Sequence, residues 1–305
     1  MALLTAPESS RPRIAAVGTW DGVHLGHRHL LAHLISEGER RTLAPTAVTF
    51  ATHPLATVRP ERVPRMLCTL DERVRRLHEA GVMDVVVLDF DENLRRLTAR
   101  EFLEMLRRDY GVEAVILGFN NSFGSDRLGS FEDYREAGAQ VGVEVLCAPE
   151  WCAGEEHVSS SAVRRLIAEG AVEHAAALLS RPVTLSGMVV EGKQLGRTIG
   201  FPTANLAVSA DAAVPGPGVY AADALLHTGE RHRAIVNIGY RPTVDRSPDA
   251  RESIEAHLLN FHGDLYGHPV TLTFLKRLRD EQRFPDLTAL RAQLTRDAAA
   301  ARQIR

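Results

Sequence analysis

Hydrophobic residues in the first half of the chain fall into short continuous runs, separated by segments with helical spacing. Continuous apolar runs, which are typical of buried strands, occupy residues 14–18, 45–50, 84–90, 112–118 and 143–149. Amphipathic segments, which predict helices, occupy residues 28–40, 70–81, 98–111 and 130–138. Because strands and helices alternate, the pattern predicts an α/β domain with a parallel sheet and helices on both faces.

The pattern changes after about residue 182. Short β-rich runs separated by Gly, Pro and Asn turns occupy residues 183–192, 218–227, 231–239, 252–261 and 269–278. No helical segment lies between these runs, so they favour an antiparallel β-barrel, in which closure removes exposed strand edges. A helical stretch at 287–303 follows. We therefore expect two domains, 1–182 and 183–305.

Composition and charge exclude several classes of protein. The 36 Lys and Arg residues against 39 Asp and Glu give a net charge of −3, which offers no electrostatic argument for nucleic acid or an anionic membrane. Three cysteines are too few for a disulfide framework or a four-ligand zinc site, and they fit a reducing cytoplasm. We recognise neither a signal peptide nor a run that could span a bilayer. We expect a cytoplasmic protein, and weak self-association is left open.

The stretch GTWDGVHLGH (18–27) lies where the first predicted strand passes into the first helix. A helix N-terminus leaves N–H groups unpaired and carries partial positive charge, and glycines such as Gly18 and Gly22 let a phosphate approach the backbone. His24 and His27 lie three positions apart, on one side of a helical turn, and can donate to the same anion. This arrangement suits attack on the α-phosphorus of a nucleoside triphosphate, where charge builds on the phosphoryl oxygens.

A second phosphate-binding pattern occurs in VSSSAVRRLIAEG (158–170). Its serine cluster supplies N-cap candidates, and arginines follow within the first turns of the predicted helix. Ser161 and Arg164 are therefore candidates for holding another phosphate group.

Three motifs resemble one known family: GTWDGVHLGH, VSSSAVRRLIAEGAVEHAAALLSRPVTLSGMVVEGKQLGRTIGFPTANL and HLLNFHGDLYG. They are similar to the bacterial bifunctional riboflavin kinase/FMN adenylyltransferase (FAD synthetase) family, over nearly the whole chain. The resemblance implies an N-terminal Rossmann-like nucleotidyltransferase domain and a C-terminal antiparallel β-barrel of the riboflavin kinase type. It also implies that the ATP site for adenylyl transfer contains Gly18, Asp21, Gly22, His24, His27, Asn120, Ser161 and Arg164.

The segment EGKQLGRTIGFPTANL (191–206) suits another triphosphate. Spaced glycines and basic residues make a loop that can close over phosphates, namely Gly192, Lys193, Gly196, Arg197 and Gly200. Thr203 and Asn205 offer neutral oxygens, which suit a Mg²⁺ ion that keeps some of its waters. The resemblance implies that this loop is the ATP and Mg²⁺ site of the kinase module.

Glu255 lies in an alternating strand that has apolar residues on one face and Glu255 and His257 on the other. A carboxylate aimed into the mouth of a barrel can take the proton of a primary alcohol as it attacks the γ-phosphorus. The resemblance makes Glu255 the expected base. It also implies that Arg279 and Asp280 lie in a segment near the flavin and the ATP, and a simple charged turn is the alternative.

Several positions depart from the family pattern. In TFATHP (49–54), Ala51 and Thr52 stand where an acid and a proline are usual. In GFNNSFG (118–124), Asn121 stands where an aromatic residue is usual, and Ser161 replaces a threonine. All of these positions belong to the adenylyltransferase half, so they leave its nucleotide preference open.

The sequence thus predicts a bifunctional enzyme that phosphorylates riboflavin to FMN and adenylylates FMN to FAD, with ATP as the donor and Mg²⁺ as the cofactor. An alternative is an active kinase whose N-terminal module is weakened or uses another nucleotide. A flavin-binding protein without catalysis is a third hypothesis, against which His24, His27, Thr203, Asn205 and Glu255 argue. The expected partners are these small molecules, and neither nucleic acid nor a membrane.

Overall fold

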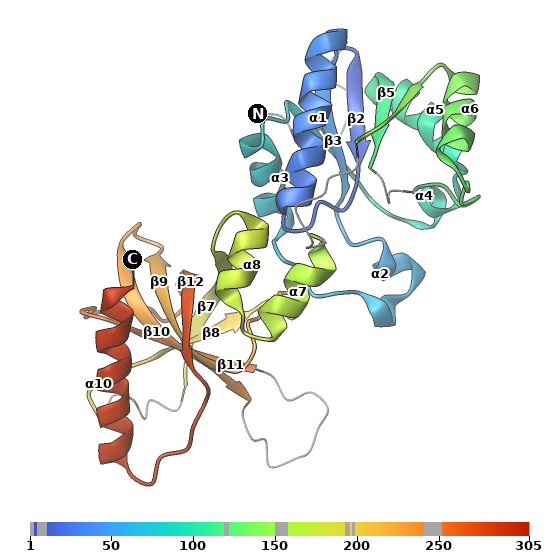
Figure 1. Cartoon of the computed structure of the whole chain (residues 1–305). Helices are drawn as coiled ribbons and strands as arrows, with labels where there is room; N and C mark the ends of the chain where they lie inside the picture. The colour runs from blue at the N-terminus through green and yellow to red at the C-terminus, as the bar shows by residue number, and fades with distance from the viewer. Residues whose placement is uncertain are drawn as a thin grey trace. The chain divides into compact units, whose positions relative to one another are not determined.

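The structure is a computed structural model that describes residues 3–4, 11–118, 122–149, 158–192, 196, 199–240 and 252–304. Contacts divide the chain into two compact units, Met1–Ser159 and Ser160–Arg305, whose elements are labelled in Figure 1. Helices α7 (Ser160–Ala168) and α8 (Val172–Leu179) belong to the second unit, because α8 packs on strands of the barrel and α7 packs on α8. The boundary at residue 182 stays a prediction about the catalytic modules.

The first unit is built on a parallel sheet with the strand order β1-β4-β3-β2-β5-β6. Its strands are β1 (Leu3–Leu4), β2 (Arg13–Val17), β3 (Ala44–Phe50), β4 (Asp84–Leu88), β5 (Val112–Leu117) and β6 (Glu144–Cys147). Every residue of β2 and β3 is buried, as expected for strands covered on both faces. The predicted Rossmann-like arrangement is therefore confirmed.

Helices cover both faces of this sheet (Figure 1). One apolar cluster joins Ala16 and Ala47 of the sheet to α1 and α3, and another joins Ala15 and Val48 to α5 and α6. The helical segments of the unit are α1 (Leu25–Arg41), α2 (Leu55–Val58), η1 (Pro60–Arg62), α3 (Leu70–Glu79), α4 (Glu92–Arg96), α5 (Ala99–Tyr110) and α6 (Phe131–Val141). The strand order reverses at β2, which pairs with β3 on one side and β5 on the other. In open α/β sheets, ligands bind beyond the carboxyl ends of the strands at such a point.

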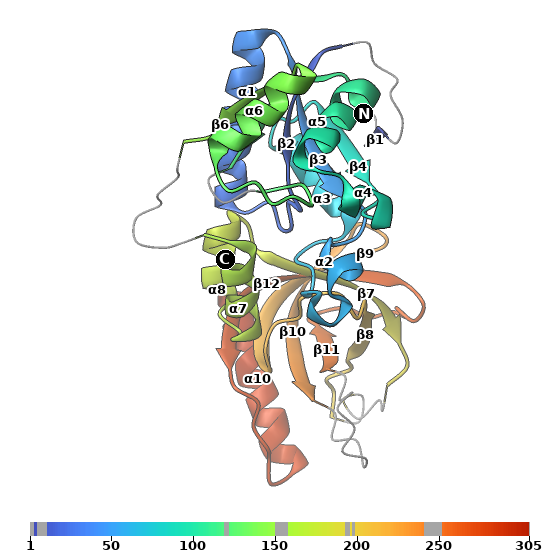
Figure 2. The ribbon, with the colours of Figure 1, turned by 90° about the vertical axis from the view of Figure 1, so that its right-hand side faces the viewer.

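The second unit is a closed antiparallel barrel with the order β10-β11-β8-β7-β12-β9, seen from another side in Figure 2. Its strands are β7 (Val183–Val190), β8 (Ala204–Val208), β9 (Gly218–Leu226), β10 (Arg231–Tyr240), β11 (Glu252–Leu258) and β12 (Pro269–Arg279). The predicted barrel is confirmed. Sequence reasoning missed β8 and α8, because each is short and β8 follows directly on the glycine-rich loop.

Strand registers separate the inside of the barrel from the outside. Ala256 pairs with Val236, and Val236 pairs with Tyr220, so these fully buried side chains share the inner face. Helix α10 (Leu287–Gln303) packs on the outer face, where Ala298 and Ala301 contact Val219, Ala221 and Ile235. Among the described residues, no helix has the length and apolar character needed to cross a membrane.

Candidate active sites

The loop between β2 and α1 has an unusual backbone. Trp20 and Val23 adopt left-handed conformations with φ of 50° and 42°, although neither is glycine, and both side chains are buried. Left-handed residues with bulky side chains are costly, so the surroundings must hold them. The indole Nε1 of Trp20 donates to the carbonyl oxygen of Val48 at 3.0 Å, which ties the loop to the end of β3.

His24 is the N-cap of α1. Its Nδ1 accepts the backbone N–H of His27 at 3.3 Å, and the two imidazole rings stack with centroids 3.7 Å apart. The helix therefore begins three residues before the predicted start at residue 28, since a histidine performs the capping. Because Nδ1 is the acceptor, a neutral His24 ring carries its proton on Nε2. The structure brings the two predicted histidines together at a helix N-terminus.

Gly26 allows this close packing. A Cβ atom at this position would lie 3.3 Å from the His24 ring and 3.3 Å from the carbonyl oxygen of Val158. The first turn of α1 is thus in contact with both neighbours, and a side chain here would push the His24 ring.

Asp21 is fully buried, with an exposed fraction of 0%. Its Oδ1 and Oδ2 accept the backbone N–H of Leu67 at 2.9 and 3.1 Å. The Cys68 thiol donates to Asp21 at 3.7 Å and accepts the N–H of Gly22 at 3.3 Å, while burial raises the pKa of this thiol to about 11. In this structure the predicted ATP ligand Asp21 ties the loop to residues 67–68.

A cavity of about 320 Å³ opens at the carboxyl ends of the strands. It is lined by the loop after β2 and by four aromatic side chains, including Gly18, Thr19, Phe50, Phe90, Phe102 and Phe123. Phe50 meets Phe90 edge to face with centroids 5.3 Å apart. Sequence reasoning missed this cavity, although phenylalanines following successive strands were a signal for a flat aromatic ligand.

Several predicted residues of this module cannot be placed together. Asn120 and Asn121 lie outside the described residues. Ser161 is exposed and Arg164 half-buried on α7, in the second compact unit. Thr52 is exposed after β3. The clamp formed by Ser161 and Arg164 stays a prediction.

A polar row crosses three neighbouring strands of the barrel. Glu255 of β11 pairs with Asn205 of β8 on one side and with Asn237 of β10 on the other. Ile254 and Ala256 are buried inside, so Glu255 faces the outside of the barrel. This agrees with the predicted division of the strand into an apolar face and a face that carries Glu255, while a position of Glu255 at the barrel mouth stays a prediction.

The loop before β8 packs closely on this row. Asn205 is 7% exposed, and a Cβ atom on Gly192 would lie 2.1 Å from its Nδ2. Only glycine leaves room for the amide there. Gly196 accepts the backbone N–H of Phe201 at 2.8 Å, and Gly200 has a φ of 81°. Lys193 and Arg197 lie outside the described residues.

His257 holds the backbone just before Thr203. Its Nδ1 lies 2.8 Å from the carbonyl oxygen of Pro202, and its ring lies 5.0 Å from that of Phe201. Burial lowers the pKa of His257, while the hydrogen bond to Pro202 opposes this shift. A neutral ring that donates from Nδ1 therefore holds the residue preceding Thr203.

A cavity of about 390 Å³ lies beside Thr203. Its lining comes from the start of β8, from β11 and from the segment that follows β11, including Pro202, Thr203, Ala256, Phe261, Asp264 and Tyr266. This lining contains most of the HLLNFHGDLYG motif. The cavity thus joins the two kinase motifs identified in the sequence.

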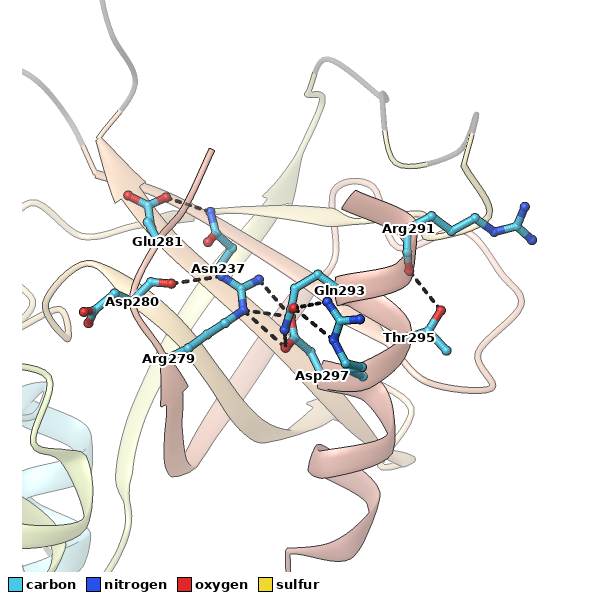
Figure 3. A network of polar contacts seen from close by, with 9 residues as sticks. Asn237, Arg279, Asp280, Glu281, Arg291, Gln293, Thr295 and Asp297 are labelled. Carbon is cyan, nitrogen blue, oxygen red and sulfur yellow. Dashed lines mark hydrogen bonds and ion pairs between the residues drawn. The ribbon is translucent and has the colours of Figure 1, made fainter. Parts of the chain in front are cut away.

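Arg279, expected near the flavin, is engaged in an ion pair (Figure 3). Its guanidinium binds Asp297 of α10 with Nη2 2.8 Å from Oδ2, and Asp297 also accepts Gln293 Nε2 at 2.7 Å. The side chain of Asp280 is 83% exposed, and its Oδ1 lies 2.9 Å from Nη2 of Arg277. Arg279 therefore anchors α10 to the end of β12, and a flavin role for either residue stays a prediction.

Comparisons with known proteins cover nearly the whole chain. A family model described as FAD synthetase matches residues 6–162, and one described as riboflavin kinase matches residues 179–305. The bifunctional riboflavin kinase/FMN adenylyltransferase of Escherichia coli (strain K12) is 38% identical over 292 residues, covering 95% of this chain and 92% of that protein. That of Bacillus subtilis (strain 168) is 30% identical, with 95% and 92% coverage.

The chain belongs to the bifunctional riboflavin kinase/FMN adenylyltransferase family. Among solved structures, that of a macrolide-efflux protein from Streptococcus pneumoniae is similar, with a TM-score of 0.86 and 29% identity over 98% of this chain and 96% of that one. This likeness shows that the two-unit architecture has a counterpart of the same fold. The predicted family, and the pairing of kinase and adenylyltransferase activities in one chain, are confirmed.

Family membership raises the question of Mg²⁺. The described residues contain no cluster of three or more His, Cys, Asp and Glu side chains that could hold a metal. The kinase unit instead offers neutral oxygens on Thr203 and Asn205, and Asn205 pairs with Glu255 between strands β8 and β11. Oxygen donors of this kind fit a Mg²⁺ ion that keeps several waters and is shared with ATP phosphates.

Proposed function

We propose that the two units carry out consecutive steps of flavin cofactor synthesis with the residues described here. The barrel unit transfers the γ-phosphoryl group of ATP to the ribityl hydroxyl of riboflavin, giving FMN and ADP. The N-terminal unit transfers the adenylyl group of a second ATP to the FMN phosphate, giving FAD and pyrophosphate. The capped, stacked histidine pair is the observation that carries the adenylyl step, and the polar row of the barrel carries the kinase step.

In adenylyl transfer, an oxygen of the FMN phosphate attacks the α-phosphorus of ATP, and the bond to the pyrophosphate oxygen breaks. His24 presents Nε2–H because Nδ1 is occupied by the His27 backbone. The His27 ring stacks on the His24 ring at the N-terminus of α1, where the helix carries partial positive charge. Both imidazoles would stabilise charge on the transferring group, with Ser161 and Arg164 on the pyrophosphate.

The cavity beside Gly18 and Thr19 suits the isoalloxazine ring of FMN. Its aromatic lining matches a flat, largely apolar ring, and it adjoins the glycine-rich loop that leads to the histidines. Phe123 belongs to GFNNSFG, so this motif still supplies one aromatic wall. FMN bound there would present its phosphate toward the N-terminus of α1.

In the kinase step, Glu255 would take the proton of the ribityl hydroxyl as its oxygen attacks the γ-phosphorus. Its neighbours Asn205 and Asn237 are amides, so the carboxylate does not face another charge within the row. Thr203 and Asn205 would hold a Mg²⁺ ion, which supplies neutralisation of phosphate charge when bound. The cavity beside Thr203 would take the adenosine part of ATP.

A second candidate differs only in the N-terminal unit. Ala51 and Thr52 replace the usual acid and proline after β3, beside a cavity wall formed by Phe50. This observation favours a module with weakened activity or another nucleotide donor. Competition among ATP, CTP and GTP with FMN as the acceptor separates the two candidates.

The experiment that tests the proposal supplies purified protein with riboflavin, ATP and Mg²⁺, and separates FMN from FAD by chromatography. Glu255→Gln should abolish FMN formation from riboflavin and leave the conversion of added FMN to FAD intact. Changing both His24 and His27 to Asn should do the reverse. Each activity is therefore the control for the other, and joint loss would contradict the division of labour.

The composition of the chain bears on its cellular location and partners. We propose a cytoplasmic enzyme with small-molecule partners, supported by the near-neutral net charge of −3 and by three cysteines without a framework spacing. Weak self-association stays a prediction.

A further inference from the structure

Arg73 is a buried cation that takes no part in either proposed reaction. It lies on α3, and its exposed fraction is 3%. No carboxylate among the described residues forms an ion pair with it, and its Nε has no hydrogen-bond partner there. A buried guanidinium without a counter-ion is expensive, so its position calls for a reason.

The contacts of Arg73 are concentrated on the end of one strand. Its Nη1 donates to Thr49 Oγ1 at 3.0 Å and to the carbonyl oxygen of Phe50 at 2.8 Å. The Thr49 hydroxyl in turn donates to the carbonyl oxygen of Thr19 at 3.3 Å. One guanidinium nitrogen therefore links the end of β3 to the loop after β2.

Both endpoints of this link are walls of the aromatic cavity. Thr19 and Phe50 line it, and Phe50 packs edge to face on Phe90. Arg73 reaches them from the opposite side of the sheet, because Val48 and Phe50 contribute to the α5–α6 face whereas Ala47 contributes to the α1–α3 face. Thr49 alternates with Phe50 and so faces α3.

We propose that Arg73 is a positioning residue of the adenylyltransferase site, which sets the spacing of the flavin-binding walls through Thr49. This inference rests on the proposed role of the cavity as the site of the isoalloxazine ring. Charged donors make stronger hydrogen bonds than neutral ones, so an arginine holds the two carbonyl-bearing segments more firmly than a glutamine would. The residue acts on flavin affinity and does not touch the reacting phosphates.

Matched variants separate positioning from general stability. Arg73→Met removes the donor and keeps an unbranched chain, while Arg73→Lys keeps a charged donor. Thr49→Val removes the relay hydroxyl with the same shape, while Thr49→Ser keeps it. Arg76→Met is the control, because Arg76 lies one turn along the same helix and its ion pair is with Glu72.

The readouts are the KM values for FMN and ATP in FAD formation, the Kd for FAD, and the riboflavin kinase rate of the same full-length variants. FAD is neither a substrate nor a product of the kinase step, so its binding reports the N-terminal unit. Arg73→Met and Thr49→Val should each raise KM for FMN and Kd for FAD about tenfold, as expected for loss of a charged hydrogen bond. Arg73→Lys and Thr49→Ser should keep both constants close to the wild-type values. The double variant Arg73→Met/Thr49→Val should be no worse than either single variant.

Under this proposal KM for ATP and the kinase rate change less than about twofold in all variants, and Arg76→Met matches the wild type. The proposal would be overturned if Arg73→Met left KM for FMN and Kd for FAD unchanged. It would also be overturned if Arg73→Lys raised both constants as much as Arg73→Met does. If the wild type binds FAD in an Arg73-dependent way but forms none from FMN and ATP, the proposed function fails and the positioning role stands.

Discussion

The Nδ1 atom of His24 accepts the backbone N–H of His27, so one imidazole both caps α1 and stacks on the second histidine at 3.7 Å. Capping and chemistry can be separated, because asparagine is also a good N-cap. His24→Asn should lower FAD formation by about a hundredfold or more while leaving stability close to the wild type. His24→Ala should lose the same activity and about 1 kcal/mol of unfolding free energy as well. Steady-state assays and urea unfolding measure both effects, and equal stability of the two variants would contradict the capping role.

Replacing Gly192 should damage the kinase alone. A Cβ atom there would lie 2.1 Å from Asn205 Nδ2, so Gly192→Ala must displace the amide that neighbours Glu255. We expect the riboflavin kinase kcat/KM to fall about tenfold or more, with FMN adenylylation unchanged. In an Asn205→Ala background the same substitution should cost little, because the obstructing amide is gone. An equal cost in both backgrounds would show that Gly192 acts through the loop backbone instead.

The buried ion pair of the first unit should be important for stability. Arg13 Nε lies 3.0 Å from Asp84 Oδ2, and Arg13 also donates to the carbonyl oxygen of Tyr110. Asp84→Ala leaves a buried guanidinium without its carboxylate and should cost about 3 kcal/mol or more in urea unfolding. Arg13→Met combined with Asp84→Leu should recover part of that loss. A double variant worse than the sum of the single ones would contradict this account.

His257 should make the barrel unit less stable in mild acid. Burial lowers its native pKa below the ordinary histidine value that it has when unfolded. Between those two values the unfolded state binds more protons, so the unfolding free energy falls as the pH drops through the window below the ordinary pKa. His257→Gln keeps a donor for Pro202 but does not titrate, and should flatten this slope. Urea unfolding at a series of pH values measures it, with the exposed His262→Gln as the control.

The cysteines should differ in reactivity. Burial raises the pKa of Cys68 to about 11, whereas Cys147 is exposed. Thiolates are the reactive form, so a maleimide at pH 8 should label Cys147 rapidly and Cys68 only after unfolding. Peptide mapping by mass spectrometry distinguishes them. Rapid labelling of Cys68 in the folded protein would mean that the Asp21 loop opens readily.

Local patterns predicted most of the secondary structure. The helix predicted over residues 98–111 from its amphipathic spacing is present as α5, and a capping box of Thr98 and Glu101 with both hydrogen bonds marks its start. The start of α1 could not be predicted, because histidine is not among the common N-caps. Strand β8 was missed because its burial is confined to Asn205 and Leu206, too little for a periodic signal.

The candidate sites depended more on contacts between distant parts of the chain. Alternation correctly divided β11 into two faces, but the partners of Glu255 on the outer face, Asn205 and Asn237, come from other strands and follow only from the closed barrel. Asp21 has the sequence context of a phosphate-site residue, yet its partner Leu67 lies 46 positions away. The aromatic cavity likewise gathers side chains from separate strand ends, which no single motif records.

Because Glu255 faces the outside of the barrel, its position depends on which residues of β11 point outward and which point inward. The wall of the barrel is one strand thick, so neighbouring positions serve opposite sides. A shift of the register by one position would turn Glu255, the proposed base, into the core and bring a core residue to the outer face. A shift by two positions would keep the alternation and put another outward-facing residue in the place of Glu255. An insertion or deletion in this strand should therefore be tolerated better when it adds or removes an even number of residues than an odd number.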